Sequence, residues 1–258
     1  MGIVIGITNQ KGGVGKTTSA VNISACLSAA NKKTLLVDMD PQGNSTSGVG
    51  IDKKSAKITT YELLLEKITS QSAIIQTQYP NLFLIPADIR LIGAEIELIN
   101  LSFREYRLKL ALNAIIDNFD YIIIDTPPSL GILTLNSLVF SDYLIIPVQA
   151  EYYALEGLSL QMDTIKRVQT NLNQHLKIGG ILVTMFDSRT NLAQQVFQEL
   201  KRHFGDLVFN TQIPRSVRFG EAPSFGKPII YYDFHSLASD GYIELTGEII
   251  DRFEGDKL

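Results

Sequence analysis

The chain has 258 residues, carries a formal net charge of −4, and is 45% hydrophobic and 19% charged. This composition is typical of a folded globular protein and excludes a disordered chain or a wholly basic DNA-coating protein. The single cysteine, Cys26, excludes an internal disulfide and a cysteine-ligated metal cluster. No apolar run approaches the roughly 20 residues that span a bilayer, and the first apolar run begins too early for a signal peptide. We therefore expect a cytoplasmic protein.

Apolar runs and amphipathic stretches alternate along the chain. The runs predict strands at residues 3–8, 34–38, 82–86, 121–125, 143–148, 178–184 and 207–210. The amphipathic stretches predict helices near residues 17–31, 60–66, 90–99, 103–118, 155–173, 191–204 and 234–254. Consecutive apolar positions are typical of parallel strands covered on both faces. We expect one α/β domain over residues 1–258, with a mostly parallel twisted sheet and helices on both faces, and a mobile surface loop at 41–59.

A glycine-rich turn follows the first expected strand and opens the first expected helix. Its residues are Lys11, Gly12, Gly13, Val14, Gly15, Lys16, Thr17 and Thr18. Such a turn binds phosphate, because the glycines let backbone N–H groups approach the anion and the helix N-terminus adds a partial positive charge. We expect Lys16 to contact the terminal phosphates, Thr17 to bind Mg²⁺ and Thr18 to reach the α-phosphate. The turn departs from the ordinary motif, since Gln10 replaces its first glycine and a second lysine, Lys11, precedes the remaining glycines.

Carboxylates follow two of the expected strands. Asp38 and Asp40 end the strand at 34–38, and Asp125 ends the strand at 121–125. In a parallel sheet the carboxyl ends of the strands line the ligand crevice, so these side chains should converge on the phosphates and the metal. We expect Asp125 to hold the water shell of Mg²⁺ and Asp38 to share that task. Asp38 and Asp40 lie on one face of an extended segment, with Asp40 projecting farther toward the γ-phosphate.

Together these motifs resemble those of the deviant Walker A ATPases, and within them the ParA/Soj chromosome- and plasmid-partition proteins. The wider class is indicated by residues 11–18, 38–43 and 124–129, and the partition branch by residues 147–153, 184–190 and 213–218. The resemblance runs nearly end to end. It implies an ATPase with ATP and Mg²⁺ as cofactors and a weak intrinsic rate of hydrolysis.

The resemblance also assigns roles within the active site. It implies that Asp40 orients or activates the attacking water, so that the catalytic candidates are Lys11, Lys16 and Asp40. It further implies that Lys11 crosses into a partner subunit, so that two monomers sandwich two ATP molecules. A cation supplied in trans acts like an arginine finger and makes dimerisation depend on the γ-phosphate. A solvated loop lysine is the alternative for Lys11.

The adenine contacts are implied by the same resemblance. In the family the base packs against a loop after the late strands, which here contains Pro214, with Met185 nearby at the end of another strand. A simple turn at Pro214 is the alternative.

The resemblance singles out Arg189 and Arg218 as contacts to double-stranded DNA. Four more cations could extend their patch, namely Arg215, Lys201, Arg202 and Lys227. An ATP-dependent homodimer would pair two such surfaces, which bind phosphates without reading bases. Residues 185–228 hold six Lys or Arg against four acids, so a solvated face remains the alternative. The implied partner is a ParB-type centromere-binding protein, and the implied location is the nucleoid.

Other functions of the same ATPase class fit less well. A membrane-docking ATPase would carry a basic amphipathic C-terminal helix, whereas residues 248–258 are acidic overall. We expect no N-terminal helix-turn-helix extension, and hence no sequence-specific operator binding. The remaining alternative is a ParA-like ATPase that positions cargo on a non-DNA scaffold.

Overall fold

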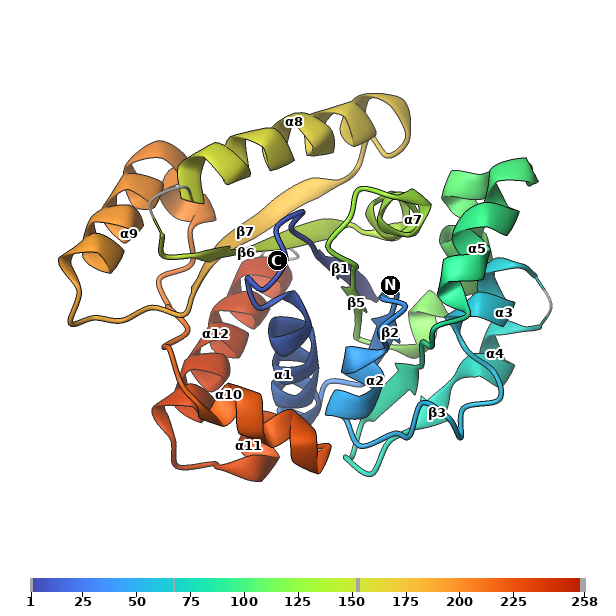
Figure 1. Ribbon diagram of the computed structural model, residues 1–258, viewed down its shortest axis with the longest axis horizontal. Helices are drawn as coiled ribbons and strands as arrows, with labels where there is room; N and C mark the ends of the chain where they lie inside the picture. The colour runs from blue at the N-terminus through green and yellow to red at the C-terminus, as the bar shows by residue number, and fades with distance from the viewer. Residues whose placement is uncertain (1, 67, 152–153, 256–258) are drawn as a thin grey trace.

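A seven-stranded sheet forms the centre of the molecule, in the order β3-β4-β2-β5-β1-β6-β7 (Figure 1). The computed structural model describes residues 2–66, 68–151 and 154–255. The strands are β1 (Ile3–Ile7), β2 (Thr34–Asp38), β3 (Ile75–Gln76), β4 (Leu82–Ile85), β5 (Tyr121–Asp125), β6 (Tyr143–Gln149) and β7 (Lys177–Thr184). All neighbouring strands are parallel except β3 and β4. The carboxyl ends of β1, β2 and β5 therefore meet at one edge of the sheet.

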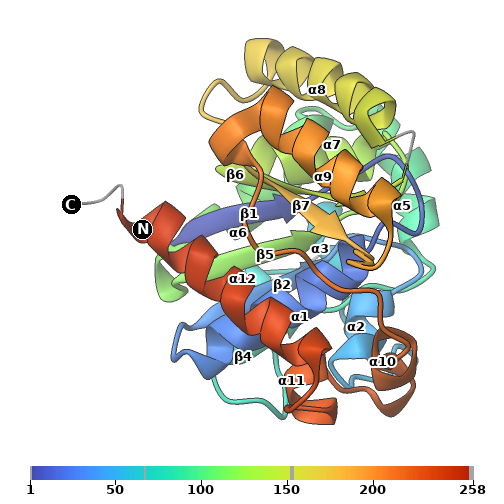
Figure 2. The same ribbon diagram turned by 90° about the vertical axis from the view of Figure 1, so that its left-hand side faces the viewer.

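Helices cover both faces of the sheet, as Figure 2 shows. One face packs on α1 (Lys16–Ala29), α11 (Ile229–Tyr232) and α12 (Leu237–Glu254). The other packs on α3 (Thr60–Leu64), α5 (Leu91–Glu97), α6 (Arg107–Leu112) and α7 (Ile132–Phe140), and at β6 and β7 on α8 (Ala154–Asn171) and α9 (Asn191–Phe204). Successive residues of β5 alternate between the two cores, with Tyr121 and Ile123 in one and Ile122 and Ile124 in the other. The doubly covered α/β sheet predicted from the sequence is confirmed.

Short helical segments complete the chain. The remaining α-helices are α2 (Asn44–Gly48), α4 (Ser70–Ala73) and α10 (Arg218–Glu221). Short 3₁₀ turns occupy Leu98–Asn100, Arg104–Tyr106, Asn113–Asn118, Gly205–Leu207 and Ala222–Phe225. The helix expected at 103–118 is thus divided into three segments, with α6 in the middle. In the described ranges, no helix combines the length and apolar character needed to cross a membrane.

The strand expected at 207–210 is wrong. Val208 forms only an isolated bridge with Ile181, and the backbone N–H groups of Asn210 and Thr211 donate to the Glu248 carboxylate instead of to a neighbouring strand. The Glu248 side chain of α12 therefore accepts the backbone hydrogen bonds in a segment where the apolar pattern predicted pairing with a neighbouring strand.

The mobile loop expected at 41–59 is also wrong in its first part. Helix α2 forms there, and both Ser45 and Thr46 are fully buried against the end of the sheet. Residues 152–153 of the late motif and 256–258 of the acidic tail lie outside the described residues.

Candidate active site

The glycine-rich turn joins β1 to α1 and is open on its concave side. Gly13 and Gly15 have left-handed backbone conformations, with φ of 74° and 91°, which disfavour residues with a Cβ. A Cβ added to Gly12 or Gly13 would meet no atom within 4 Å. The backbone of Gly12 and Gly13 therefore faces open space.

That space is a cavity of about 380 Å³ whose walls come from the segments after four strands, β1, β2, β5 and β7, and from α1 and α2. It is lined by Gly12, Gly13, Gly15, Lys16, Thr17, Thr18, Asp40, Gln42, Asn44, Pro128 and Met185. Val14 of the turn is buried instead, and its carbonyl accepts a hydrogen bond of 2.8 Å from the Thr184 hydroxyl. The turn is thereby held against the end of β7.

Lys16 is the first residue of α1 and is 6% exposed. Its ammonium donates to the carbonyl of Lys11 at 3.0 Å, which folds the side chain back over its own turn. Burial lowers the pKa of Lys16, whereas the charges of Asp125 and Asp40 oppose that shift. The ammonium is thus held in a poorly solvated position, where a phosphate group would supply the counter-charge.

Asp125 ends β5 and is fully buried. Its Oδ2 accepts a hydrogen bond of 2.7 Å from the Ser45 hydroxyl, while its Oδ1 has no hydrogen-bond partner among the described residues. Burial and the charge of Asp38 raise the pKa of Asp125 to about 8, against hydrogen bonds from Ser45 and Thr17. A buried carboxylate oxygen without a donor, beside Thr17, fits a hydrated Mg²⁺ held by few protein ligands and by phosphate.

Asp38 lies opposite Asp125 in the β2–β5 register, but its oxygens have protein partners. Oδ1 accepts from the backbone N–H of Asp40 at 3.1 Å, and Oδ2 accepts from both the N–H and the hydroxyl of Thr46. Burial raises the pKa of Asp38 to about 6, although these donors oppose the shift. No group of three or more His, Cys, Asp or Glu side chains forms a metal-binding cluster in the part of the chain described.

Asp40 lies two residues beyond β2 and lines the phosphate cavity. Its Oδ1 accepts from the N–H of Gln42 at 2.9 Å, and its carbonyl accepts from the N–H of Gly43 at 2.8 Å. The two carboxylates therefore occupy different places. Asp38 lies behind the wall of the cavity, whereas Asp40 lines the cavity, as expected if Asp40 projects farther than Asp38.

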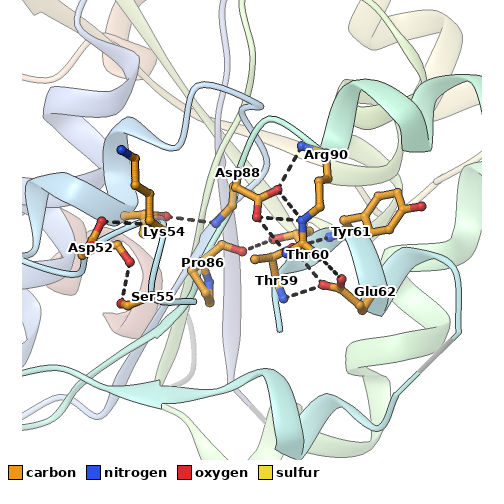
Figure 3. A network of polar contacts seen from close by, with 12 residues as sticks. Asp52, Lys54, Ser55, Thr59, Thr60, Tyr61, Glu62, Pro86, Asp88 and Arg90 are labelled. Carbon is orange, nitrogen blue, oxygen red and sulfur yellow. Dashed lines mark hydrogen bonds and ion pairs between the residues drawn. The ribbon is translucent and has the colours of Figure 1, made fainter. Parts of the chain in front are cut away.

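A polar network lies around Thr59, Thr60, Glu62, Asp88 and Arg90 (Figure 3). The Thr60 hydroxyl contacts the carbonyls of both Asp38 and Pro86, at 2.6 and 3.0 Å, and so ties the end of β2 to the end of β4. Arg90 donates to Asp88 and to Glu62, whose carboxylate also accepts from the Thr59 N–H at the start of α3. These contacts fix the segment that carries Asp38 and Asp40.

Lys11 lies at the mouth of the turn, with a side chain that is 56% exposed. Its ammonium forms an ion pair of 2.8 Å with Glu151, just after β6. Within one subunit Lys11 therefore points away from its own phosphate cavity. An exposed pair of this kind contributes only about 0–1 kcal/mol, so it is readily exchanged for another anion.

A second cavity of about 290 Å³ adjoins the first and shares Gly15, Thr18 and Met185 with it. Its lining also includes Pro214, Arg215, Phe219 and Tyr242. Met185 has a left-handed φ of 51°, and the next residue, Phe186, bridges to Pro214. This geometry brings together the two residues expected near the base and forms a pocket next to the phosphates.

Comparisons with known proteins agree with this geometry. Residues 2–178 match a family model described as an AAA domain. The chain is 55% identical to the sporulation initiation inhibitor protein Soj of Bacillus subtilis, over 96% of this chain and 98% of that protein. It is 52% identical to the chromosome-partitioning ATPase Soj of Treponema pallidum, over 98% of each chain. The chain belongs to the ParA/Soj family of chromosome-partitioning ATPases.

Solved structures confirm the fold of this ParA/Soj protein. The structure of cobyrinic acid a,c-diamide synthase from Mycobacterium smegmatis, with bound ATP analog and magnesium, has a TM-score of 0.87 and 35% identity. The match covers 99% of this chain and 97% of that one. The family and the fold class predicted from the sequence are both confirmed.

The ParA/Soj resemblance singled out two arginines for DNA, and four further cations could extend their patch. The surroundings of these six side chains differ. Arg189, just before α9, is 86% exposed and pairs with Asp187 at 2.7 Å. Arg218, the first residue of α10, pairs with Glu221 at 2.8 Å and with Asp233 at 3.2 Å. The two principal arginines are thus exposed to solvent, but each is already neutralised by an acid of its own subunit.

The four supporting cations are less uniform. Lys201 donates to the Val208 carbonyl and to Asn210, and Arg202 pairs with Glu199. Both lie in the last turn of α9, about 15 Å along the helix axis from its start near Arg189. Hydrogen bonds from Arg189 lower the pKa of its partner Asp187, and the charge of Arg215, which lines the second cavity, adds to that shift. Lys227 lines a third cavity, between α1 and α2. Arg215 therefore lies near Arg189, whereas Lys201 and Arg202 lie toward the other end of α9.

Two site residues were missed by the sequence analysis. Ser45 and Thr46 contact Asp125 and Asp38 directly, yet residues 41–59 were expected to form a mobile loop. A run of Gly, Asn, Ser and Thr is typical of a loop, so the local sequence offered no signal for this helix.

Proposed function

We propose that this ParA/Soj ATPase segregates DNA, by forming an ATP-sandwich homodimer that binds double-stranded DNA without sequence preference and is released when a partner stimulates hydrolysis. ATP and Mg²⁺ are its cofactors. One observation carries the proposal: Lys16, Thr17 and Asp40 line the same cavity, which continues into a pocket of suitable size for a base.

The chemistry follows from positioning and charge neutralisation. Lys16 binds the β- and γ-phosphates, and Thr18 contacts the α-phosphate. Thr17 and Asp125 hold Mg²⁺, whose role is to neutralise charge on the phosphates, with Asp38 supporting that site from behind. Asp40 orients the water that attacks the γ-phosphate. The base rests against Met185 and Pro214.

Dimerisation requires Lys11 to exchange one anion for another. In a single subunit the Lys11 ammonium is paired with Glu151, and its partly exposed side chain lies at the mouth of the turn. We infer that the γ-phosphate of the partner subunit replaces Glu151 as its counter-ion. The exchange costs little because the pair is exposed, and it makes the dimer depend on ATP.

DNA binding is the outcome of that pairing. Two subunits double the number of arginines that face one duplex, and affinity rises steeply with the number of phosphates neutralised. Arg189 and Arg218 are the principal contacts, with Arg215, Lys201, Arg202 and Lys227 in supporting positions. A ParB-type centromere-binding protein then stimulates hydrolysis and resets the cycle, in a cytoplasmic protein associated with the nucleoid.

The decisive experiment uses Asp40→Ala, which should bind ATP and dimerise but not hydrolyse it. Light scattering with and without MgATP should give a dimer only with ATP, and Lys11→Ala should remain a monomer in both conditions. Mobility shifts on unrelated duplexes should appear only with ATP. A mass that does not change with ATP argues against the sandwich. A dimer that ignores DNA at low salt would favour the ParA-like ATPase acting on a non-DNA scaffold.

A further inference from the structure

Helix α2 begins immediately beyond Asp40 and contacts both buried carboxylates of the site. Gly43 precedes it with a left-handed φ of 61°, so that the chain turns sharply after Asp40. The next residues after Asn44 are Ser45 and Thr46, both fully buried. Asp38 and Asp125 lie opposite each other on β2 and β5, and the two adjacent hydroxyls reach one carboxylate each.

Thr46 joins three parts of the structure. Its N–H and its hydroxyl both donate to Asp38 Oδ2, at 2.9 and 2.7 Å. The same hydroxyl accepts from the N–H of Ala87, beyond the end of β4, at 3.0 Å. One side chain therefore links α2, β2 and the turn after β4, and both hydrogen-bonding functions of its hydroxyl are used.

Ser45 contacts the other carboxylate. Its hydroxyl donates to Asp125 Oδ2 at 2.7 Å, which leaves Oδ1 as the buried oxygen without a partner among the described residues. A hydrogen bond to Oδ2 fixes the rotation of the Asp125 carboxylate, so Oδ1 is held in one orientation. Outer-shell hydrogen bonds of this kind orient the groups that bind a metal.

Asp40 is attached to this helix by a very short connection. Its side chain accepts from Gln42 and its carbonyl from Gly43, so the segment 40–43 is a closed turn that leads directly into α2. We propose that Ser45 and Thr46 are positioning residues for ATP hydrolysis, which set the place of Asp40 relative to the metal-site carboxylate Asp125. The inference rests on the proposed roles of Asp40 and Asp125.

The two hydroxyls have separable effects. Ser45 acts through Asp125, so its loss should weaken the metal site. Thr46 acts through Asp38 and the α2 turn, so its loss should displace Asp40 and slow hydrolysis, while leaving the phosphate-binding turn at residues 11–18 intact. Ser47, on the same helix, donates to the carbonyls of Gly43 and Asn44 and, among the described residues, to neither buried carboxylate. Ser47→Ala is therefore a matched control.

The test compares Ser45→Ala, Thr46→Val and Thr46→Ser with Ser47→Ala in the full chain. Mn²⁺ affinity is measured by electron paramagnetic resonance with a non-hydrolysable ATP analogue, and kcat and KM are measured with MgATP. We expect Ser45→Ala to weaken Mn²⁺ binding by about 10-fold. We expect Thr46→Val to lower kcat by about 10-fold with KM changed by less than about threefold, and Thr46→Ser to restore kcat.

A readout without nucleotide completes the experiment. Amide exchange at residues 43–49 should accelerate in Thr46→Val and stay near wild type in Ser47→Ala. Unchanged Mn²⁺ affinity in Ser45→Ala together with unchanged kcat in Thr46→Val would overturn the inference. If Thr46→Val does not fold, the Mn²⁺ measurement is sufficient by itself: equal Mn²⁺ affinities for Ser45→Ala and Ser47→Ala would overturn the inference. Normal turnover by Asp40→Ala would instead overturn the proposed role of Asp40, which separates the two failures.

Discussion

The nucleotide-facing end of the sheet and the surface that carries Arg189 and Arg218 differ in how their charges are held. At the sheet end, Asp38, Asp125 and Lys16 are buried. Their hydrogen-bond partners come from helix α2, from the turn after β2 and from the glycine-rich turn. On the surface, Arg189 and Arg218 are exposed and are paired with acids two or three residues away in sequence, as well as with Asp233.

That contrast determines how each region responds to a ligand. A buried charge loses solvation on folding, so a phosphate or a cation that supplies the missing counter-charge gains the full electrostatic interaction. An exposed ion pair is worth little in water, so an external phosphate can displace it at low cost and with strong dependence on salt. We expect the first region to respond sharply to single substitutions, and the second to respond with a strong dependence on salt.

The largest effect should come from Lys16→Ala. The buried ammonium faces the phosphate cavity, and hydrogen bonds to charged groups are worth about 1.5–3 kcal/mol, so ATP affinity should fall by about 10- to 100-fold. Isothermal titration calorimetry measures the ATP affinity of each variant. Lys11→Ala is the matched control, because the exposed lysine of the same turn should leave the affinity of an isolated subunit unchanged. Equal affinities for Lys16→Ala and wild type would remove Lys16 from the phosphate site.

Arg218→Glu and Arg189→Glu should follow in size. Each should abolish DNA mobility shifts near physiological salt and leave ATP-dependent dimerisation intact, since neither arginine lines the phosphate cavity. Arg167→Glu, an exposed arginine on α8, is the control and should retain binding. If Arg218→Glu or Arg189→Glu gives the same DNA mobility shifts as wild type over a range of salt concentrations, that arginine does not contact DNA.

A smaller effect should distinguish the two buried carboxylates by pH. The raised pKa of Asp125, about 8 in the fold, means that the folded state binds more protons than the unfolded state between about pH 4 and 8. Stability of the nucleotide-free protein contributed by this group therefore falls as pH rises through that window. Asp125→Asn should raise the Tm at pH 8 by about 2–4 °C for each kcal/mol recovered, and should raise it by much less at pH 5.

Asp38→Asn supplies the contrast for that measurement. Donors contact both oxygens of Asp38, so an amide nitrogen would have to face an N–H or a hydroxyl group. The Tm of the Asp38→Asn variant should therefore fall at both pH 5 and pH 8. Calorimetry without nucleotide gives both results, and a fall for Asp125→Asn at pH 8 would contradict the assignment of an unsatisfied carboxylate there.

The smallest effect should come from Arg202→Gln and Lys201→Gln. Both cations lie at the far end of α9 and already have partners in their own subunit. Each should weaken DNA binding by no more than about twofold, with a salt slope reduced by less than about one. A loss as large as that of Arg218→Glu would show that the DNA-contacting surface extends along the whole of α9.

Much of this arrangement could be predicted from local sequence, for identifiable reasons. Runs such as Ile122 to Ile124 are apolar at every position because helices cover both faces of the sheet. The phosphate turn and Asp125 follow such strands directly. Helix α7 escaped prediction because it is buried almost all round and shows no polar face to mark its period. The two-residue strand β3 depends on pairing with β4 and has no pattern of its own.

The parts that could not be predicted depend on contacts between distant residues. The strand expected at 207–210 is replaced by a segment whose N–H groups bind Glu248 of α12. The positions of Ser45 and Thr46 depend on two carboxylates that come together only when β2 and β5 pair. The ion pair between Lys11 and Glu151 joins residues 140 positions apart, and no local pattern encodes it.

The packing of α12 on α1 has a consequence for the timing of biogenesis. Ser19, one turn into the phosphate-binding helix, shares a hydrogen bond with Tyr242, which lies 223 residues later and also lines the base pocket. At a synthesis rate of about 5–20 residues per second, roughly 10–45 s separate the two residues on the ribosome. Throughout that interval α12 is not available to pack on α1. A nascent chain therefore contains the phosphate-binding turn long before its nucleotide-binding site is complete.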